Sequence, residues 1–192
     1  MTPPDSSRDR PCAPREVRCL ISSEQIASRV RELAAQISAD YAGKVPLLVG
    51  VLKGAWVFMA DLVRHLSIPV RCDFVKLSTY GANTNSSGEV QLHLDLTISA
   101  EGQDILLVED IIDTGTTVPW LLDRLVKKHP ASVRLCALLD KPARRRVPVK
   151  IDYLGFTIPN YFVVGYGIDA AEEFRELPYI GYIPAEDQTP GG

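Results

Sequence analysis

The chain has 192 residues, enough for one domain, and 46% of them are apolar, a proportion typical of globular proteins. Its formal net charge is −3 at pH 7. These values exclude a largely disordered chain and a strongly basic protein of the kind that binds nucleic acid. No apolar run approaches the roughly 18 residues of a membrane-spanning helix, so we expect neither nucleic acid nor a membrane as a partner.

The two ends of the sequence are polar. Residues 1–14 are rich in Pro, Ser, Arg and Asp and lack the apolar core of a signal peptide, and residues 184–192 are polar as well. We therefore expect a flexible tail at each end and a single domain over residues 15–183.

The four cysteines, Cys12, Cys19, Cys72 and Cys136, match no zinc-binding spacing. Cys72 and Cys136 lie in apolar runs, where a thiol packs as a small hydrophobic group. None of the three histidines has another histidine three or four residues away. We expect free thiols in a reducing cytoplasm, and no histidine-based metal site.

The first part of the chain alternates helical and strand-like patterns. Ser22 and Gln25 have the spacing of a capping box, and apolar residues then recur at helical intervals over about 18 residues. A continuous apolar run at 46–52 predicts a strand that is buried on both faces. A helix over 55–66 and a strand over 69–77 follow.

A long polar loop over 78–89 interrupts this pattern, and such loops inside compact chains are usually functional or disordered. Pro119 suits the first turn of a helix, where its missing N–H costs nothing. The elements predicted beyond the loop are a half-exposed strand over 90–96, a buried strand over 104–108, a helix over 118–128, and strands over 132–139, 150–156 and 161–166. Strands that alternate with helices predict an α/β fold with a mostly parallel central sheet flanked by helices.

The most informative segment follows the strand at 104–108. Two carboxylates, Glu109 and Asp110, come first, and a turn with small hydroxyl residues and one glycine then leads into a helix. The four residues of this turn, which we call the anion cradle, are Thr114, Gly115, Thr116 and Thr117. Free N–H groups at a helix start bind anions, and a glycine lets the backbone approach them closely. We therefore predict that the anion cradle binds a phosphate.

Three carboxylates, Glu109, Asp110 and Asp113, lie next to this cradle and would repel a bare phosphate. Sugar hydroxyls can donate to carboxylates, and Mg²⁺ favours carboxylates together with substrate phosphates. The combination points to a phosphorylated ribose. The alternative, helix capping by Asp113 or Thr114 with solvated strand-end acids, explains one residue of the cluster. The glycine patterns of triphosphate and dinucleotide sites are absent.

The segment Val108-Glu-Asp-Ile-Ile-Asp-Thr-Gly-Thr-Thr117 resembles the phosphoribosyl-pyrophosphate signature of the type I phosphoribosyltransferase family. Asp113, at its sixth position, is typical of the enzymes for 6-oxopurines. Further matching pieces are Leu52-Lys53-Gly54, Ser78-Thr79-Tyr80-Gly81, Lys141, the run from Tyr161 to Asp169, and Phe174-Arg175. The resemblance covers about residues 21–183. It implies a small hood over the carboxyl edge of the sheet, built from the N-terminal and C-terminal segments.

The reaction that this resemblance implies is purine salvage: hypoxanthine or guanine displaces pyrophosphate from 5-phosphoribosyl-1-pyrophosphate, with Mg²⁺ as cofactor. Asp113 would accept the proton at purine N7 as the general base. The anion cradle would bind the 5′-phosphate. Glu109 and Asp110 would hold the ribose hydroxyls, directly or through the metal ion, and Asp169 would ligate a second Mg²⁺.

The resemblance also assigns the contacts to pyrophosphate. Lys53 and Gly54 would bind it, with a cis peptide between Leu52 and Lys53, and Arg175 would contact it as well, since arginine suits bidentate phosphate recognition. Ser78, Thr79 and Tyr80 open a segment that resembles the mobile catalytic loop, which would close over the site and expel water.

The purine would be held by residues from several elements, namely Ile111, Lys141, Phe162, Val163 and Asp169. Lys141 would donate to the purine O6, because lysine is a donor only, which favours 6-oxopurines over adenine. Phe162 would stack on the base with Ile111 on its other face, although an aromatic residue in an apolar strand can equally belong to the core. Lys53 and Lys141 have the alternative of being ordinary exposed lysines. We assign the basic run at 144–146 mostly to the surface.

Two positions depart from the family pattern. Ala55 stands where some members have a second glycine, and Thr116 stands where mammalian relatives have lysine. The competing functions are a phosphoribosyl-pyrophosphate-sensing regulator of the same fold, for which a basic face or added DNA-binding unit is missing, and a phosphoribosyl-pyrophosphate synthetase, whose chains are longer. The family implies a homodimer or homotetramer.

Overall fold

A computed structural model describes residues 16–79 and 90–184. Its first elements are strand β1 (Arg18–Ile21) and helix α1 (Ser23–Asp40). Ser22 is the N-cap of α1, where its hydroxyl accepts from Gln25 N and the Gln25 side chain accepts from Ser22 N, so the predicted capping box is confirmed. The helix has 18 residues, as expected.

The central sheet has six strands in the order β4-β3-β2-β5-β6-β7. All neighbours are parallel except the β3–β4 pair at one edge. The strands are β2 (Leu47–Leu52), β3 (Arg71–Thr79), β4 (Val90–Leu94), β5 (Asp104–Ile112), β6 (Ser132–Asp140) and β7 (Tyr153–Thr157). The predicted fold class, a mostly parallel sheet flanked by helices, is confirmed.

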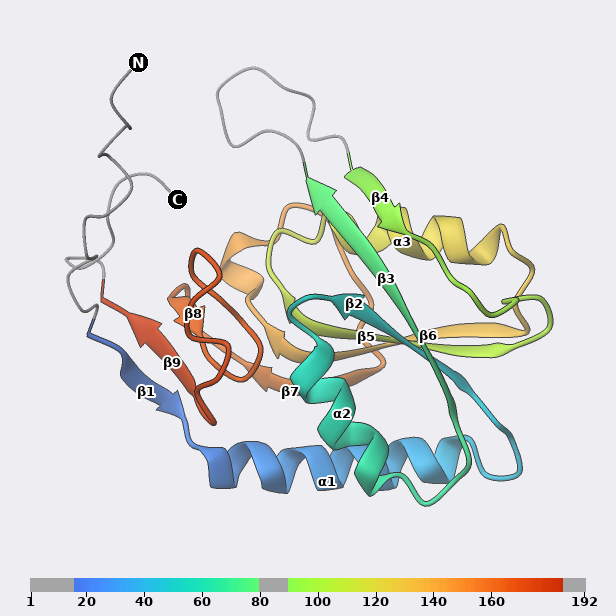
Figure 1. The fold of residues 1–192 in the computed structure, drawn as a ribbon, viewed down its shortest axis with the longest axis horizontal. Helices are drawn as coiled ribbons and strands as arrows, with labels where there is room; N and C mark the ends of the chain where they lie inside the picture. Colours follow the sequence, from blue (N-terminus) through green and yellow to red (C-terminus); the bar gives the residue numbers. More distant parts are fainter. Residues whose placement is uncertain (1–15, 80–89, 185–192) are drawn as a thin grey trace, which may run out of the picture.

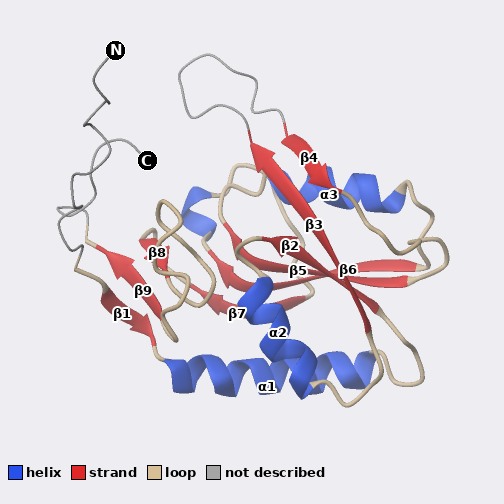
Figure 2. Cartoon of the chain, in the orientation of Figure 1, coloured by secondary structure: helices blue, strands red, loops and turns tan. Residues whose placement is uncertain are grey.

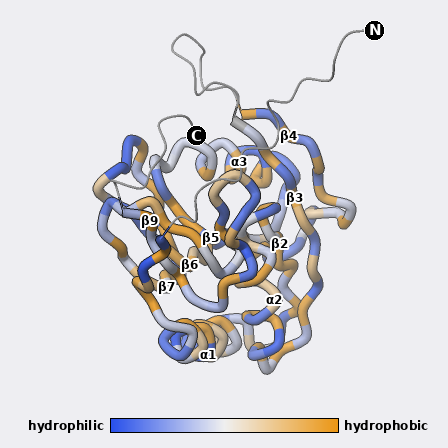
Figure 3. The backbone as a smooth tube through the Cα atoms, turned by 60° about the vertical axis from the view of Figure 1, so that its left-hand side comes forward, coloured by the Kyte–Doolittle hydropathy of each residue, from blue (hydrophilic) through white to orange (hydrophobic). Residues whose placement is uncertain are grey.

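Helices cover both faces of this sheet. Helix α2 (Trp56–His65) lies beside α1 on one face, and α3 (Thr117–Val126) lies on the other (Figure 2). Because side chains alternate along a strand, Leu48 packs with the α1 and α2 side, whereas Leu47 packs with the α3 side. The strands are therefore apolar on both faces, as their continuous runs predicted. In Figure 3, by contrast, hydrophobic and hydrophilic colours alternate along α1, which buries one face.

A second, smaller sheet stands at the carboxyl edge of the first and forms the hood (Figure 1). Its order is β1-β9-β8, with β8 at Phe162–Val164 and β9 at Ile180–Ile183. The central strand β9 is antiparallel to both neighbours and pairs Tyr182 with Arg18. The first and last strands of the described chain thus build the hood together, as the resemblance implied.

Some expectations need correction, and others fall outside the described residues. Strand β5 does not end at residue 108 but continues to Ile112, since β6 pairs with it up to Asp140. Cys72 is exposed and only Cys136 is buried, although both are free thiols, as is Cys19. The predicted tails at 1–14 and 184–192 and the loop at 78–89 lie largely outside the described ranges.

Candidate active site

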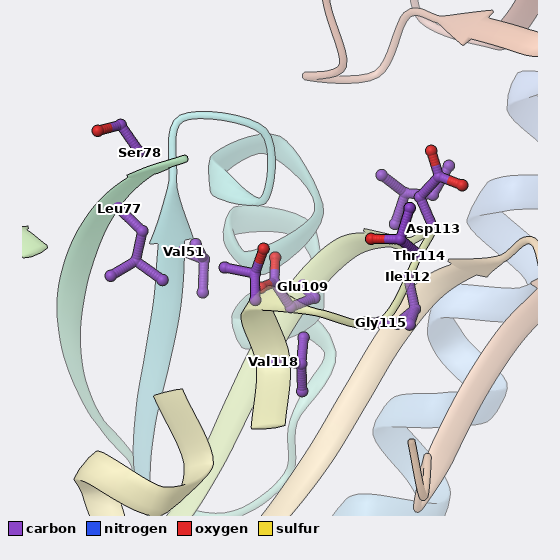
Figure 4. Close-up of a pocket in the computed structure, with 11 residues that line it drawn as sticks. Val51, Leu77, Ser78, Glu109, Ile112, Asp113, Thr114, Gly115 and Val118 are labelled. Atoms are coloured by element: carbon purple, nitrogen blue, oxygen red, sulfur yellow. The ribbon is translucent and has the colours of Figure 1, made fainter. Parts of the chain in front are cut away.

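Glu109 and Asp110 lie within strand β5, three and two residues before its last residue, Ile112. Alternation along the strand separates them: Glu109 faces a cavity of about 300 Å³, whereas the Asp110 carboxylate lies against the Cα atom of Gly54. The cavity is lined by β2, β3 and the β5–α3 turn, and Figure 4 shows Glu109 between Val51 and that turn. Glu109 therefore lines the cavity, whereas Asp110 faces the loop after β2.

The anion cradle forms the tight turn between β5 and α3. Gly115 has φ +78°, and a Cβ atom there would come within 2.6 Å of the Val147 carbonyl oxygen, so this position requires glycine. The hydroxyls of Thr114 and Thr116 lie 3.0 Å apart. Thr116 is the N-cap of α3 and makes no side-chain capping bond.

Helix capping by Asp113 or Thr114, the alternative function for this turn, is therefore wrong. The first N–H groups of α3 donate no hydrogen bond to the side chain of the N-cap residue Thr116. Thr114, Gly115 and Thr117 of the cradle line the cavity. A turn that presents uncapped N–H groups and hydroxyls to a hollow has the chemistry of a phosphate site.

Asp113 and Lys141 meet because β5 and β6 are parallel and in register. Ile112 pairs with Asp140, so the next residue of each strand emerges at the same edge, and the Lys141 Nζ–Asp113 Oδ2 distance is 3.8 Å. Lys141 is only 5% exposed. Burial lowers the pKa of Lys141, which the charge of Asp113 opposes. Lys141 is thus not the ordinary exposed lysine of the alternative interpretation.

Asp113 has one carboxylate oxygen free for a further partner. Within the described chain, Asp113 Oδ1 is buried and accepts no hydrogen bond, whereas Oδ2 lies 3.4 Å from Arg144 Nη1. A buried acceptor without a partner carries a free-energy cost that a donor on a bound molecule would remove. Asp113 therefore has one acceptor oxygen that the described chain leaves unsatisfied.

The basic run at 144–146 is mostly at the surface, as expected: Arg144 and Arg146 are exposed, and only Arg145 is half-buried. Arg145 donates to the carbonyl oxygens of Asp113 (3.1 Å) and Ile112 (3.2 Å) and binds the Asp140 carboxylate, so it holds the turn before the cradle. Arg144 contacts Asp113 as described. Arg144 is the last residue of a short 3₁₀ turn, Pro142–Arg144, directly after Lys141, and Arg145 is the C-cap of that turn.

The two acids of β5 have unusual electrostatics. Burial raises the pKa of Glu109 well above its ordinary value, and the neighbouring Asp110 raises it further. Burial also raises the pKa of Asp110 to about 6, while its hydrogen bond from Ile111 N and the charge of Arg175 oppose this rise. Raised carboxyl pKa values indicate groups placed for a ligand that supplies positive charge or donors.

The loop after β2 carries Lys53 and Gly54. The Leu52–Lys53 peptide is cis, as the resemblance implied. A Cβ atom at Gly54 would overlap the Asp110 carboxylate, so the loop can approach β5 because it has glycine there. Lys53 and Arg175 line a second cavity, of about 450 Å³, together with Leu52, Trp56 and Glu172. Two of the residues predicted to bind pyrophosphate thus share one hollow.

The residues predicted for the purine are less closely gathered. Val163 is buried in β8, whereas Phe162 is 44% exposed, so Phe162 is not a core residue. The ring stack that the structure describes nearby is Tyr161 on Tyr182, with centroids 4.5 Å apart. Ile111 is half-buried at the end of β5. The sandwich of a base between Ile111 and Phe162 remains a prediction.

The start of the predicted mobile loop lies at the first cavity. Ser78 lines it, and its hydroxyl lies 2.6 Å from His93 Nε2 across the β3–β4 pair. Thr79 is the last residue of β3, and Tyr80 lies outside the described residues.

The three predicted metal ligands, Glu109, Asp110 and Asp169, do not form one cage. Within residues 16–79 and 90–184, no group of three or more His, Cys, Asp or Glu side chains is placed to hold a metal ion. This arrangement still fits Mg²⁺, which is commonly bound by one or two carboxylates, water and substrate phosphates.

No helix within residues 16–79 and 90–184 is long and apolar enough to cross a membrane.

Comparisons with known proteins agree with this geometry. A family model described as the phosphoribosyl transferase domain matches residues 20–171. The chain is 47% identical over 166 residues to the hypoxanthine-guanine phosphoribosyltransferase of Bacillus subtilis, covering 86% of this chain and 92% of that protein. It is 48% identical over 169 residues, 88% of this chain, to the bifunctional protein TilS/HprT of Listeria innocua, of which it spans only 26%.

Solved structures show the same relationship. A hypoxanthine-guanine phosphoribosyltransferase of Bacillus anthracis is similar with a TM-score of 0.84 and 44% identity, over 88% of this chain and 100% of that one. A hypoxanthine phosphoribosyltransferase of Staphylococcus aureus is similar with a TM-score of 0.85 and 41% identity, over 90% of this chain and 94% of that one.

Proposed function

We propose that this chain, which belongs to the phosphoribosyltransferase family, transfers the 5-phosphoribosyl group from 5-phosphoribosyl-1-pyrophosphate to N9 of hypoxanthine or guanine and releases pyrophosphate. The single observation that carries the choice of base is the Asp113–Lys141 pair beside the anion cradle. A proton acceptor and a buried cation placed together match the N7–H and the O6 of a 6-oxopurine.

The anion cradle binds the 5′-phosphate in this proposal. Its uncapped N–H groups and its threonine hydroxyls donate to phosphate oxygens, and Gly115 lets the backbone come close. Glu109 and Asp110 then accept from the ribose hydroxyls. Their raised pKa values favour this role, since a hydroxyl donor relieves the cost of burying a carboxylate.

Lys141 and Asp113 act on the base. Lys141 Nζ donates to the purine O6, and it rejects the 6-amino group of adenine because both groups are donors. As N9 forms its bond to the anomeric carbon and the bond to pyrophosphate breaks, the proton on N7 passes to Asp113. The lack of a hydrogen-bond partner for Asp113 Oδ1 within the described chain supports Asp113 as the proton acceptor.

Lys53, Gly54 and Arg175 bind the leaving pyrophosphate. Both cations line the second cavity, and the Arg175 side chain is only 18% exposed, so its charge is less screened than that of a surface arginine. When bound, Mg²⁺ would neutralise pyrophosphate charge, with Glu109, Asp110 and Asp169 as the carboxylates available to it.

We infer that the protein works in the cytoplasm, since free thiols such as the exposed Cys19 and Cys72 suit a reducing compartment. We further infer a homodimer or homotetramer, which sedimentation analysis would distinguish from a monomer.

The test is a steady-state assay with Mg²⁺ and phosphoribosyl pyrophosphate against hypoxanthine, guanine, xanthine, adenine and orotate. We expect turnover of hypoxanthine or guanine and none of adenine, and Asp113→Asn should lose most of that turnover. Arg146→Gln, at an exposed position of the neighbouring basic run, is the matched control. Preference for adenine would contradict the assignment of Lys141. Binding of phosphoribosyl pyrophosphate without turnover of any base would favour a regulator of the same fold.

A further inference from the structure

The turn at 169–175 holds one acidic side chain in an unusual place. Ala171 and Glu172 have φ values of 54° and 70°, in the left-handed region that side chains other than glycine rarely adopt. The Asp169 carboxylate accepts from Glu172 N at 2.8 Å and fixes this turn. The Glu172 side chain is thereby presented to the second cavity, which it lines.

Both cations of that cavity are already engaged by carboxylates. Glu172 Oε2 lies 2.8 Å from Lys53 Nζ and 3.2 Å from Arg175 Nη2. Arg175 Nη2 also lies 2.9 Å from Asp169 Oδ1. Glu172 therefore forms an ion pair with each of the two cations. Two positive and two negative charges leave this subsite with no formal net charge.

A neutral subsite is a poor receptor for pyrophosphate, which carries several negative charges. The Glu172 carboxylate can leave the two cations at little cost in free energy, because its side chain is 65% exposed and exposed ion pairs contribute little to stability. The Asp169 carboxylate cannot leave as easily, since it is held by the turn that it fixes.

We propose that Glu172 occupies the pyrophosphate subsite as an internal anion that pyrophosphate must displace from Lys53 and Arg175. The proposal rests on the proposed function, which gives these two cations their role. Displacement of an internal anion makes pyrophosphate binding weaker than the two cations alone would make it, and so favours release of this product. Glu172 acts through the cations and is a positioning residue, not a catalytic one.

The test compares Glu172→Gln with Glu173→Gln. Glu173 is the exposed neighbour, so its substitution removes the same formal charge without touching Lys53 or Arg175. Binding of inorganic pyrophosphate with Mg²⁺ is measured by calorimetry at two salt concentrations. Removal of one charge about 4 Å from another in water predicts roughly fivefold tighter binding by Glu172→Gln. The gain should shrink at high salt, and Glu173→Gln should bind as the unchanged protein does.

Kinetics provide a second readout. The KM for phosphoribosyl pyrophosphate should fall in Glu172→Gln by a similar factor, while kcat should stay the same or fall because the product leaves more slowly. Glu172→Ala should shift both values in the same direction, and thermal unfolding checks that each variant folds. Equal or weaker pyrophosphate binding by both Glu172 variants would overturn the proposal. Failure of the proposed function is distinct: pyrophosphate binding would respond to Glu172 as expected, yet no base would be turned over.

Discussion

Replacement of Asp110 by asparagine should make the protein more stable while it impairs ribose binding. Asp110 lies in β5 with its carboxylate against the Gly54 backbone, and burial raises its pKa from 3.8 to about 6. A carboxyl whose pKa is raised by folding favours the protonated state. Its cost to stability is therefore absent below pH 3.8, grows between pH 3.8 and 6, and is complete above pH 6.

The magnitude follows from the shift. About two pKa units correspond to about 3 kcal/mol at pH 8, and about half of this cost is already present at pH 5. Asparagine has nearly the same shape, can still accept from Ile111 N, and carries no charge. It also removes the charge of Asp110, which helps to raise the pKa of Glu109. We expect Asp110→Asn to gain about 2–3 kcal/mol of unfolding free energy at pH 8 and about half of that at pH 5.

The assay is urea unfolding of the ligand-free protein at both pH values, with Asp104→Asn as the matched control. Asp104 begins the same strand, and hydrogen bonds from Ser132 and Lys44 lower its pKa, so its substitution should cost about 1 kcal/mol at pH 8. The reasoning is refuted if Asp110→Asn is no more stable than the unchanged protein at pH 8, or if its gain is the same at pH 5.

Three other substitutions test the site and the core. Lys141→Met should lower kcat/KM for hypoxanthine by roughly 30-fold, since about 2 kcal/mol of charged hydrogen bonding is lost; a loss below threefold in the steady-state assay would contradict the role of Lys141. Gly54→Ala should lower phosphoribosyl-pyrophosphate binding at least tenfold in calorimetry, because its Cβ atom would overlap the Asp110 carboxylate; unchanged binding would show that the loop can move. Phe58→Ala should cost about 3–5 kcal/mol in urea unfolding, because Phe58 is fully buried between α2 and the sheet; a cost below 1 kcal/mol would mean that the core collapses around the gap.

The fold was largely predictable because its strands are apolar on both faces and its first helix has a capping box. The β5–β6 register could not be predicted, since it depends on backbone pairing between residues almost 30 apart in the chain. The same is true of β1 and β9, which are four residues long each and too short for periodicity to reveal.

For the site, the motif at 108–117 predicted a cluster of acids and an anion turn, and the structure brings Glu109, Thr114 and Gly115 to one cavity. The arrangement of partners was beyond the sequence. Arg145 and Glu172 were missed because nothing in their sequence neighbourhood indicates their partners. Arg145 donates to the carbonyl oxygen of Asp113 in the turn before α3, and Glu172 accepts from Lys53, which is 119 residues away. Contacts of this range follow only from the packed fold.

The position of β9 in the middle of the hood has a consequence for how the protein is made. Strand β1 is synthesised before the central sheet. It cannot pair until more than 150 further residues have been made, because its partner strand is Ile180–Ile183. Strand β8 pairs with the same strand, so it too can form its hydrogen bonds only after β9 has been made. The six-stranded sheet needs no residue beyond Thr157, whereas the hood cannot form before β9, the last strand of the described chain, has been made.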